Sequence, residues 1–85
     1  GTPIEPWLPP DTIHSPRPAD EAAHAPGALF HGMIAPLSPF GVRGFLWYQG
    51  EANANRRRAH EYAPLFQALI RTWRAHFGVE EAPFY

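Results

Sequence analysis

The stretch Val42-Arg43-Gly44-Phe45-Leu46-Trp47-Tyr48-Gln49-Gly50-Glu51-Ala52-Asn53 decides the fold. Its first part is an almost continuous apolar run, which is typical of a strand that is covered on both faces in a parallel sheet. Its second part gathers amide and carboxylate side chains around a glycine, a composition that hydrophobic cores exclude. Because open α/β sheets place their ligand sites at the carboxyl ends of strands, we predict a buried strand over about 42–48 and a site loop over 49–55.

A periodic segment follows this loop and predicts a helix over about 59–77. Asn53 or Asn55 could cap its start, and Gly78 supplies a stop at its end. Pro64 is tolerable only if it falls in the first turn or two. The apolar residues at helical spacing, which form one stripe, are Tyr62, Leu65, Phe66, Leu69, Ile70, Trp73 and Phe77.

The order of these elements predicts the fold class. Residues 82–85 are apolar and aromatic and are predicted to begin a further strand. A strand, a loop, a helix and a second strand make a βαβ unit, whose strands pair in parallel through a right-handed crossover. We therefore expect an α/β fold of the three-layer sandwich type.

The first half of the chain is rich in proline and is predicted to be less regular. Residues 1–26 are expected to form an ordered loop. Residues 27–35 carry the apolar stripe of a short helix, which Pro36 would end, and Gly32 within it suggests close packing against a sheet. Trp7 could fill a hydrophobic gap in the loop, or it could line a pocket together with Glu5.

Composition excludes several classes of function. The formal net charge is −1, with seven basic residues and eight acidic ones, so no sustained basic surface for nucleic acid is expected. The Arg56–Arg58 triplet is interpreted as a solvated helix entry. No apolar run is long enough to span a membrane, and no cysteine or histidine spacing suits a structural zinc. A chain of 85 residues is marginal as a domain, and we interpret it as an excerpt from a larger α/β domain.

The polar cluster offers the groups of an anion or oxyanion pocket. The amide of Gln49 both donates and accepts hydrogen bonds, and Glu51 can accept from hydroxyls or orient a partner. Gly50 would let a ligand approach the backbone, and Asn53 adds a second amide. A structural interpretation stays open beside this one, in which Gln49 and Glu51 satisfy buried backbone groups of a turn and Asn53 caps the helix.

Residues 1–85 do not assemble a nucleophile with its base. Ser15 and Ser38 each directly precede a proline, and neither sits in a Gly-x-Ser-x-Gly turn. His60 and His76 are expected to be exposed residues at the two ends of the last helix. The sequence also has no glycine-rich loop of the kind that binds phosphate.

Four blocks of the sequence resemble consecutive blocks of the sialate O-acetylesterase family of the SGNH-hydrolase superfamily. The resemblance covers nearly the whole chain apart from about residues 8–26. It implies a flavodoxin-like three-layer α/β/α sandwich with parallel strands, and an esterase that uses a serine, without cofactor or metal, to remove acetyl groups from sialic acid or other glycans. The blocks are Gly1-Thr2-Pro3-Ile4-Glu5-Pro6-Trp7, His31-Gly32-Met33-Ile34-Ala35-Pro36-Leu37, the stretch from Gly44 to Asn53, and Leu65-Phe66-Gln67-Ala68-Leu69-Ile70-Arg71-Thr72-Trp73-Arg74.

The resemblance also implies roles for individual residues. Gln49 would stand where the superfamily more usually has an oxyanion-hole asparagine, and Glu51 would support the site by ordering the loop or contacting the sugar. Gly1 and Thr2 would belong to a turn close to the same pocket. The remaining expected substrate-binding residues are Glu5, Trp7, Tyr48, Gly50 and Asn53.

The sequence departs from the family pattern at several points. The family's nucleophile lies in a Gly-Gln-Ser-Asn block, expected upstream of Gly1, and its base lies in an Asp-x-x-His block, expected downstream of Tyr85. Ala52 stands where a serine is expected, and Pro64 interrupts a helix. Residues 1–85 are therefore expected to be a central fragment that is inactive without the rest of its polypeptide.

Two further expectations complete this interpretation. The family resemblance implies an acetylated carbohydrate as the substrate and a secreted or periplasmic location. The alternative to an esterase is a non-catalytic remnant, which either binds carbohydrate by stacking on Trp7, Trp47 and Tyr48 or only completes a sheet.

Overall fold

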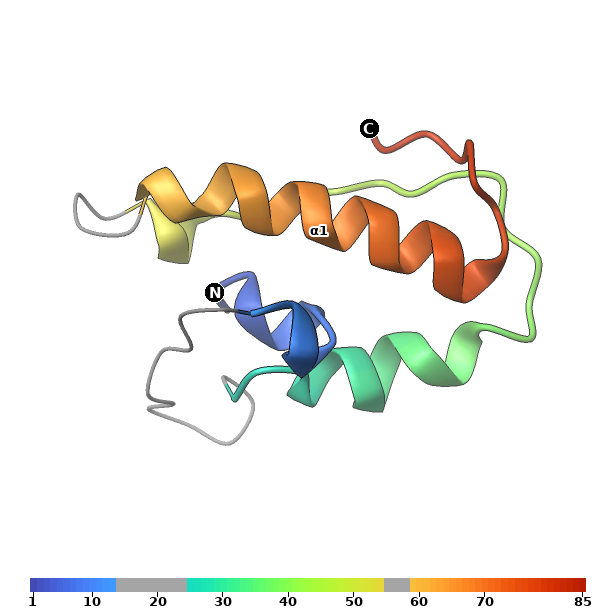
Figure 1. Ribbon diagram of the computed structural model, residues 1–85, viewed down its shortest axis with the longest axis horizontal. Helices are drawn as coiled ribbons and strands as arrows, with labels where there is room; N and C mark the ends of the chain where they lie inside the picture. Colours follow the sequence, from blue (N-terminus) through green and yellow to red (C-terminus); the bar gives the residue numbers. More distant parts are fainter. Residues whose placement is uncertain (14–24, 55–58) are drawn as a thin grey trace.

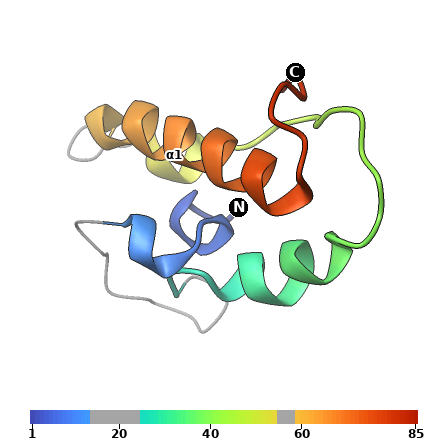
Figure 2. The ribbon, with the colours of Figure 1, turned by 45° about the vertical axis from the view of Figure 1, so that its right-hand side comes forward.

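The computed structural model describes residues 1–13, 25–54 and 59–85. The long helix α1 spans Ala59–Phe77 and lies in the middle of the molecule (Figure 1). The N-terminal segment and the helical turns after residue 28 lie along one side of α1, and an extended segment and the C-terminus lie along the other, as both views agree (Figure 2). The shorter helical elements are η1 Glu5–Trp7, η2 Pro10–Thr12, η4 Phe30–Ile34, η5 Ala35–Leu37 and η6 Glu51–Asn53.

The apolar stripe of α1 forms the core with the N-terminal segment. Leu69 is completely buried and Trp73 nearly so, and the Trp73 indole Nε1 donates to the carbonyl oxygen of Trp7 over 3.0 Å. Burial of such a face, more than helix propensity, is what stabilises a helix of this length in a protein. The buried core residues are Ile4, Leu8, Ile13, Phe30, Ala68, Leu69 and Trp73.

Both ends of α1 agree with elementary helix rules. Pro64 is exposed in its second turn, where the helix continues past it. At the other end Gly78 has a φ of 68°, the left-handed conformation that favours glycine. The Gly78 N–H donates to the Ala75 carbonyl over 3.2 Å, and the Val79 N–H donates to the Arg74 carbonyl over 2.9 Å. This pair of bonds is a Schellman motif, so Gly78 stops the helix as the sequence predicts.

Two extended segments pair in parallel on one side of α1. A single parallel bridge joins Phe45 to Phe84, and three backbone hydrogen bonds connect residues 45–47 with residues 83–85. The ring of Phe45 stacks on that of Phe84 with 4.5 Å between centroids and contacts Trp73 of α1 edge-on at 5.6 Å. An extended segment, a helix and a second segment parallel to the first are the arrangement of a βαβ unit.

The expectation of a strand over 42–48 that is buried on both faces is wrong for the described residues. None of them forms a strand longer than this bridge. Phe45 and Trp47 pack inward, whereas Leu46 is 88% exposed and Tyr48 is 95% exposed. The physical reason is that α1 covers one face of the pair, while no described element covers the other. The described residues therefore do not reach the three-layer sandwich on their own.

The short helix predicted over 27–35 is helical but packs differently from the prediction. A π-helical turn, η4, runs into the 3-10 turn η5, and the extra residue in a π turn breaks the period of the apolar stripe. Only the start of the stripe is buried, at Phe30, and Met33 is 55% exposed. A Cβ atom at Gly32 would meet nothing within 4 Å. The expected close packing of Gly32 against a sheet is therefore wrong.

The N-terminal loop contains two short helical turns and most of its apolar side chains are buried. η1 and η2 each begin at or near a proline, whose fixed φ suits a first helical position. Ile4 and Leu8 are fully buried under α1. Of the loop predicted over 1–26, the structure describes residues 1–13 and 25–26.

The core predicts a clear difference between two positions of α1. Leu69→Ala should lower the free energy of unfolding by about 2–5 kcal/mol, because it leaves a cavity in the buried cluster that also contains Ile4 and Leu8. Gln67→Ala, at an exposed position of the same helix, should change it by less than about 0.5 kcal/mol. Urea unfolding of the full polypeptide measures both, and equal effects of the two variants would contradict this description of the core.

Candidate functional site

The amide of Gln49 is held between two segments that are distant in the sequence. Its Nε2 donates to the backbone carbonyl of Thr2, and its Oε1 accepts from the Tyr62 hydroxyl of α1 over 3.1 Å. A carbonyl oxygen can only accept, so the Thr2 carbonyl fixes which end of the amide is the nitrogen. The Tyr62 hydroxyl lies 2.7 Å from the backbone oxygen of Gln49 as well. The orientation of this side chain is thus determined by its surroundings.

Tyr62 is itself held in place by Trp47. The Trp47 indole Nε1 donates to the Tyr62 hydroxyl over 3.0 Å. Burial raises the pKa of Tyr62 above its ordinary value of 10.0, the hydrogen bond from Trp47 opposes this shift, and the negative charge of Glu51 adds to it. The phenol therefore stays protonated at neutral pH, and its single hydrogen remains available to the two oxygens of Gln49.

Gly50 is required by Tyr62. Its φ is 141°, a backbone conformation that side chains of L-residues rarely adopt. A Cβ atom at this position would also lie 3.1 Å from the Tyr62 hydroxyl oxygen. The sequence suggests that this glycine allows a ligand to approach, but here the group that approaches it is Tyr62.

A cavity of about 450 Å³ lies in front of the Gln49 side chain. The N-terminal turn, the end of the extended segment and α1 all contribute to its wall. The lining residues are Gly1, Thr2, Trp7, Ile34, Leu46, Trp47, Tyr48, Gln49, Glu51 and Trp73. Six of the nine residues that the sequence predicts for the site therefore share this cavity: Gly1, Thr2, Trp7, Tyr48, Gln49 and Glu51.

The other three predicted residues, Glu5, Gly50 and Asn53, lie outside the lining of this cavity. Glu5 and Asn53 are 2% and 3% exposed. The Asn53 Oδ1 accepts from the backbone N–H of Ile4 over 2.7 Å, and its Nδ2 donates to the Glu5 Oε2 over 3.1 Å. Asn53 thus ties η6 to the N-terminal loop.

The expectation that Asn53 caps the start of the long helix is not supported, because its side chain is engaged with Ile4 and Glu5. The alternative cap, Asn55, and the Arg56–Arg58 triplet lie outside the described residues. Glu51 lies at the start of η6 and is exposed. Within the described part of the chain no hydrogen bond of its carboxylate is found.

The sequence reasoning missed Tyr62 and Trp73 as site residues. Both are members of the apolar stripe of α1, and the stripe explains them without any reference to a site. Two features of the sequence could have identified Tyr62 as a site residue. It is the one member of the stripe with a hydroxyl group, and it lies in the first turns of the helix, which follow the polar loop.

Each tryptophan indole donates a hydrogen bond within the chain. Trp7 donates to the Thr2 hydroxyl over 2.9 Å, in addition to the bonds that Trp47 and Trp73 make. The rings of Trp7 and Trp47 are half-buried, whereas the ring of Tyr48 is almost fully exposed at the edge of the cavity. Of the three aromatic side chains that the sequence suggests for stacking on a sugar, Tyr48 is therefore the most accessible.

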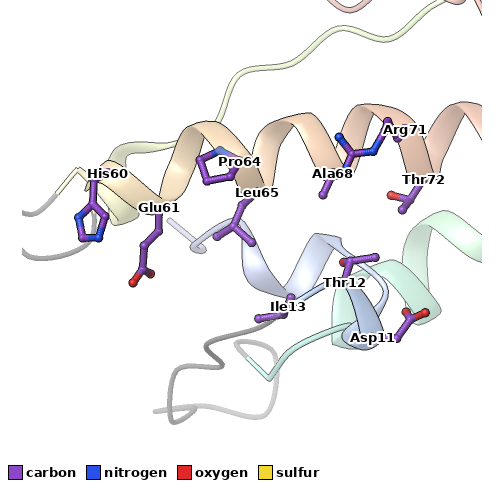
Figure 3. A pocket seen from close by; sticks show the side chains of 10 residues that line it. All are labelled: Asp11, Thr12, Ile13, His60, Glu61, Pro64, Leu65, Ala68, Arg71 and Thr72. Carbon is purple, nitrogen blue, oxygen red and sulfur yellow. The ribbon is translucent and has the colours of Figure 1, made fainter.

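A second cavity, of about 650 Å³, lies between residues 60–72 of α1 and the segment Asp11–Ile13 (Figure 3). Its wall is apolar at Ile13 and Leu65, and it includes His60. None of the residues predicted for the site line it. His60 belongs to α1, and it is exposed, as the sequence predicts.

The described residues, 1–13, 25–54 and 59–85, contain neither a cluster of metal-binding side chains nor a membrane-spanning helix. No group of three or more histidine, cysteine or acidic side chains in these ranges is placed to hold a metal ion. No helix among them combines the length and the apolar character that crossing a membrane requires.

The buried hydrogen bonds of Asn53 predict that substituting this residue lowers the stability of the protein considerably. Asn53→Ala should lower the free energy of unfolding by about 2–3 kcal/mol, because it leaves the Ile4 N–H and the Glu5 carboxylate without a partner in a buried place. Asn53→Asp keeps the size and the acceptor but sets an oxygen against Glu5 Oε2, so it should be no less destabilising at pH 7. Urea unfolding tests this, and a neutral effect of both substitutions would refute it.

Comparisons with known proteins show which family this chain resembles. The family model of the carbohydrate esterases described as sialic acid-specific acetylesterases matches residues 1–85. The sialate O-acetylesterase of Rattus norvegicus is 40% identical over 75 residues, which cover 88% of this chain and 12% of the relative. That of Homo sapiens is 33% identical over 93 residues, covering 91% of this chain and 16% of the relative.

A solved structure is similar to this chain as well. The crystal structure of a carbohydrate acetylesterase from Xanthomonas citri superposes with a TM-score of 0.86 at 41% sequence identity, over 98% of this chain and 19% of that one. The chain thus spans less than a fifth of the length of these relatives. Because the family model covers all 85 residues, the chain belongs to the sialic acid-specific acetylesterase family of carbohydrate esterases.

Proposed function

We propose that residues 1–85 are the central part of a carbohydrate O-acetylesterase and that Gln49 donates a hydrogen bond into its oxyanion hole. The observation that carries the proposal is the Gln49 amide, which is held at both ends and lies in the wall of a cavity. Its Nε2 has two hydrogens, and among the described residues Thr2 accepts one of them. The second hydrogen is the donor that the reaction would use.

A donor of this kind suits acyl transfer. In an esterase, attack on the acetyl carbonyl places a negative charge on its oxygen, and a preorganised amide stabilises that charge at no further cost of ordering. The nucleophile and the base belong to the rest of the polypeptide in this proposal, and so does the remainder of the α/β/α sandwich. The parallel pairing of Phe45 with Phe84 supports this extension of the sheet.

The substrate is proposed to be an acetylated sugar. Tyr48 offers an exposed ring on which a sugar face can stack, and Trp7 offers a half-buried one. Glu51 is an exposed carboxylate on the same cavity and can accept hydrogen bonds from sugar hydroxyls. We infer that the acetyl group points towards Gln49 and the sugar ring towards Tyr48. Such a substrate fits a secreted or periplasmic enzyme.

A carbohydrate-binding remnant without catalysis is the second candidate. The exposed ring of Tyr48 favours it, because stacking needs no nucleophile. The two candidates differ in the segment that precedes Gly1: a Gly-x-Ser-x sequence there supports the esterase, and its absence supports the remnant.

The proposal predicts a specific kinetic effect of Gln49→Ala. In the full polypeptide the kcat for an acetylated sugar should fall by about 10²–10³-fold, with KM changed little, because the lost hydrogen bond forms only in the transition state. Gln67→Ala removes the same side chain from an exposed position of α1 and should leave kcat unchanged.

Since Gln49 also ties Thr2 to α1, the thermal unfolding of the two variants must be compared as well. A fall in kcat with a melting temperature close to that of the Gln67→Ala variant supports the oxyanion role. A large drop in melting temperature that accounts for the lost activity supports a structural segment instead, and an unchanged kcat refutes the role.

Tyr48→Ala tests the placement of the sugar. It should raise KM by about 5–30-fold with a smaller effect on kcat, because about 1–2 kcal/mol of ring contact is lost in the ground state and the transition state alike. Steady-state kinetics with an acetylated sugar and with p-nitrophenyl acetate separates the effects, because the second substrate has no sugar ring. An equal loss with both substrates would contradict the stacking role.

A further inference from the structure

The Gln49 side chain needs more than one contact in order to act as a fixed donor. It has several rotatable bonds, and ordering such a side chain costs roughly 1–2 kcal/mol. The Thr2 carbonyl holds the amide at its nitrogen alone, and an amide held at one atom can still pivot about it. A second contact on the oxygen removes that freedom.

The Tyr62 hydroxyl supplies this second contact. It lies 3.1 Å from the Gln49 Oε1 and 2.7 Å from the Gln49 backbone oxygen, so one group restrains the side chain and the main chain of the same residue. With its nitrogen on Thr2 and its oxygen on Tyr62, the planar amide can direct its remaining N–H in one direction only.

Tyr62 is well suited to hold another residue. Its hydroxyl accepts from Trp47 over 3.0 Å, and its ring lies nearly parallel to that of Phe66, with 6.0 Å between centroids. Gly50 packs directly against Tyr62, because a Cβ atom added to Gly50 would lie only 3.1 Å from the Tyr62 hydroxyl oxygen. Groups carried by a helix and supported in this way are more precisely placed than groups on loops.

We propose that Tyr62 is a positioning residue of the esterase, which acts on the reaction through the Gln49 amide and without touching the substrate. The proposal rests on the proposed function of Gln49. It concerns a residue that lies outside the lining of the cavity, and it explains why a tyrosine occupies the first position of an otherwise apolar stripe.

The test is a double-mutant cycle between Tyr62→Phe and Gln49→Ala in the full polypeptide. Tyr62→Phe keeps the ring and removes the hydroxyl, and we expect kcat to fall about tenfold with KM within about twofold of its original value, as for the loss of one hydrogen bond. In the Gln49→Ala background the same substitution should change kcat by less than about twofold, because the residue through which it acts is gone.

Tyr85→Phe is the matched control. It removes a hydroxyl from a side chain that is 77% exposed, and it should leave kcat and KM unchanged. The affinity for methylboronic acid gives a second readout, because its trigonal boron becomes a tetrahedral mimic of the acyl-transfer intermediate when the serine oxygen adds to it, and Tyr62→Phe should weaken this affinity by the same factor as it lowers kcat. Near-UV circular dichroism verifies that each variant is folded.

The outcomes separate this proposal from the one on which it rests. If Gln49→Ala lowers kcat and Tyr62→Phe does not, the positioning role is overturned and the oxyanion role stands. If Tyr62→Phe lowers kcat equally in both backgrounds, Tyr62 acts independently of Gln49 and the positioning role is overturned as well. If Gln49→Ala leaves kcat unchanged, both proposals fall.

Discussion

The hydrogen bonds of the Gln49 amide join the three parts of the molecule on which the candidate site depends. One bond reaches the N-terminal turn at Thr2, the other reaches α1 at Tyr62, and Gln49 itself ends the extended segment. These residues are 47 and 13 positions away from it in the sequence. Because all three segments line the cavity, these contacts help to fix its shape, and the structure and the proposed chemistry share the same side chain.

Helix α1 provides the rigid base for this arrangement. The apolar stripe of α1 buries Leu69 against the N-terminal loop, and Tyr62 and Trp73 of the same stripe contact the extended segment. Aromatic residues suit this contact with the extended segment because they fill space with their rings and satisfy polar groups with their N–H or O–H. The indole N–H of Trp73 bonds a backbone carbonyl of the loop, so α1 is connected to both neighbours by hydrogen bonds as well as by apolar contact.

The sequence was informative wherever a local pattern decides the structure. The apolar stripe of α1 and the left-handed Gly78 that ends the helix are both determined by residues close together in the sequence, and the structure confirms both predictions. The interior of the proposed sheet depends on partners, and the described residues supply only the Phe45–Phe84 bridge, which leaves Leu46 exposed. The prediction that Gly32 packs closely against a sheet was wrong, because the π turn η4 changes the helical period. The amino-acid sequence contains no local pattern that predicts such a turn.

The site was predictable in its composition and not in its internal contacts. The cluster around Gln49 stands out because polar residues directly follow an apolar run. That Asn53 would turn towards Ile4 and Glu5, and that Tyr62 would hold Gln49, depends on distances between segments far apart in the chain. Hydrogen-bond partners of this kind follow from the fold, and a single sequence does not encode them in any local spacing.

The most direct measurement of the central claim is a crystal structure of the full polypeptide with methylboronic acid bound at its active site. We predict that the Gln49 Nε2 lies about 2.7–3.1 Å from a boronate oxygen while it still donates to the Thr2 carbonyl and its Oε1 still accepts from Tyr62. A boronate whose oxygens are held entirely by other groups, with the Gln49 nitrogen beyond hydrogen-bond distance, would contradict the account.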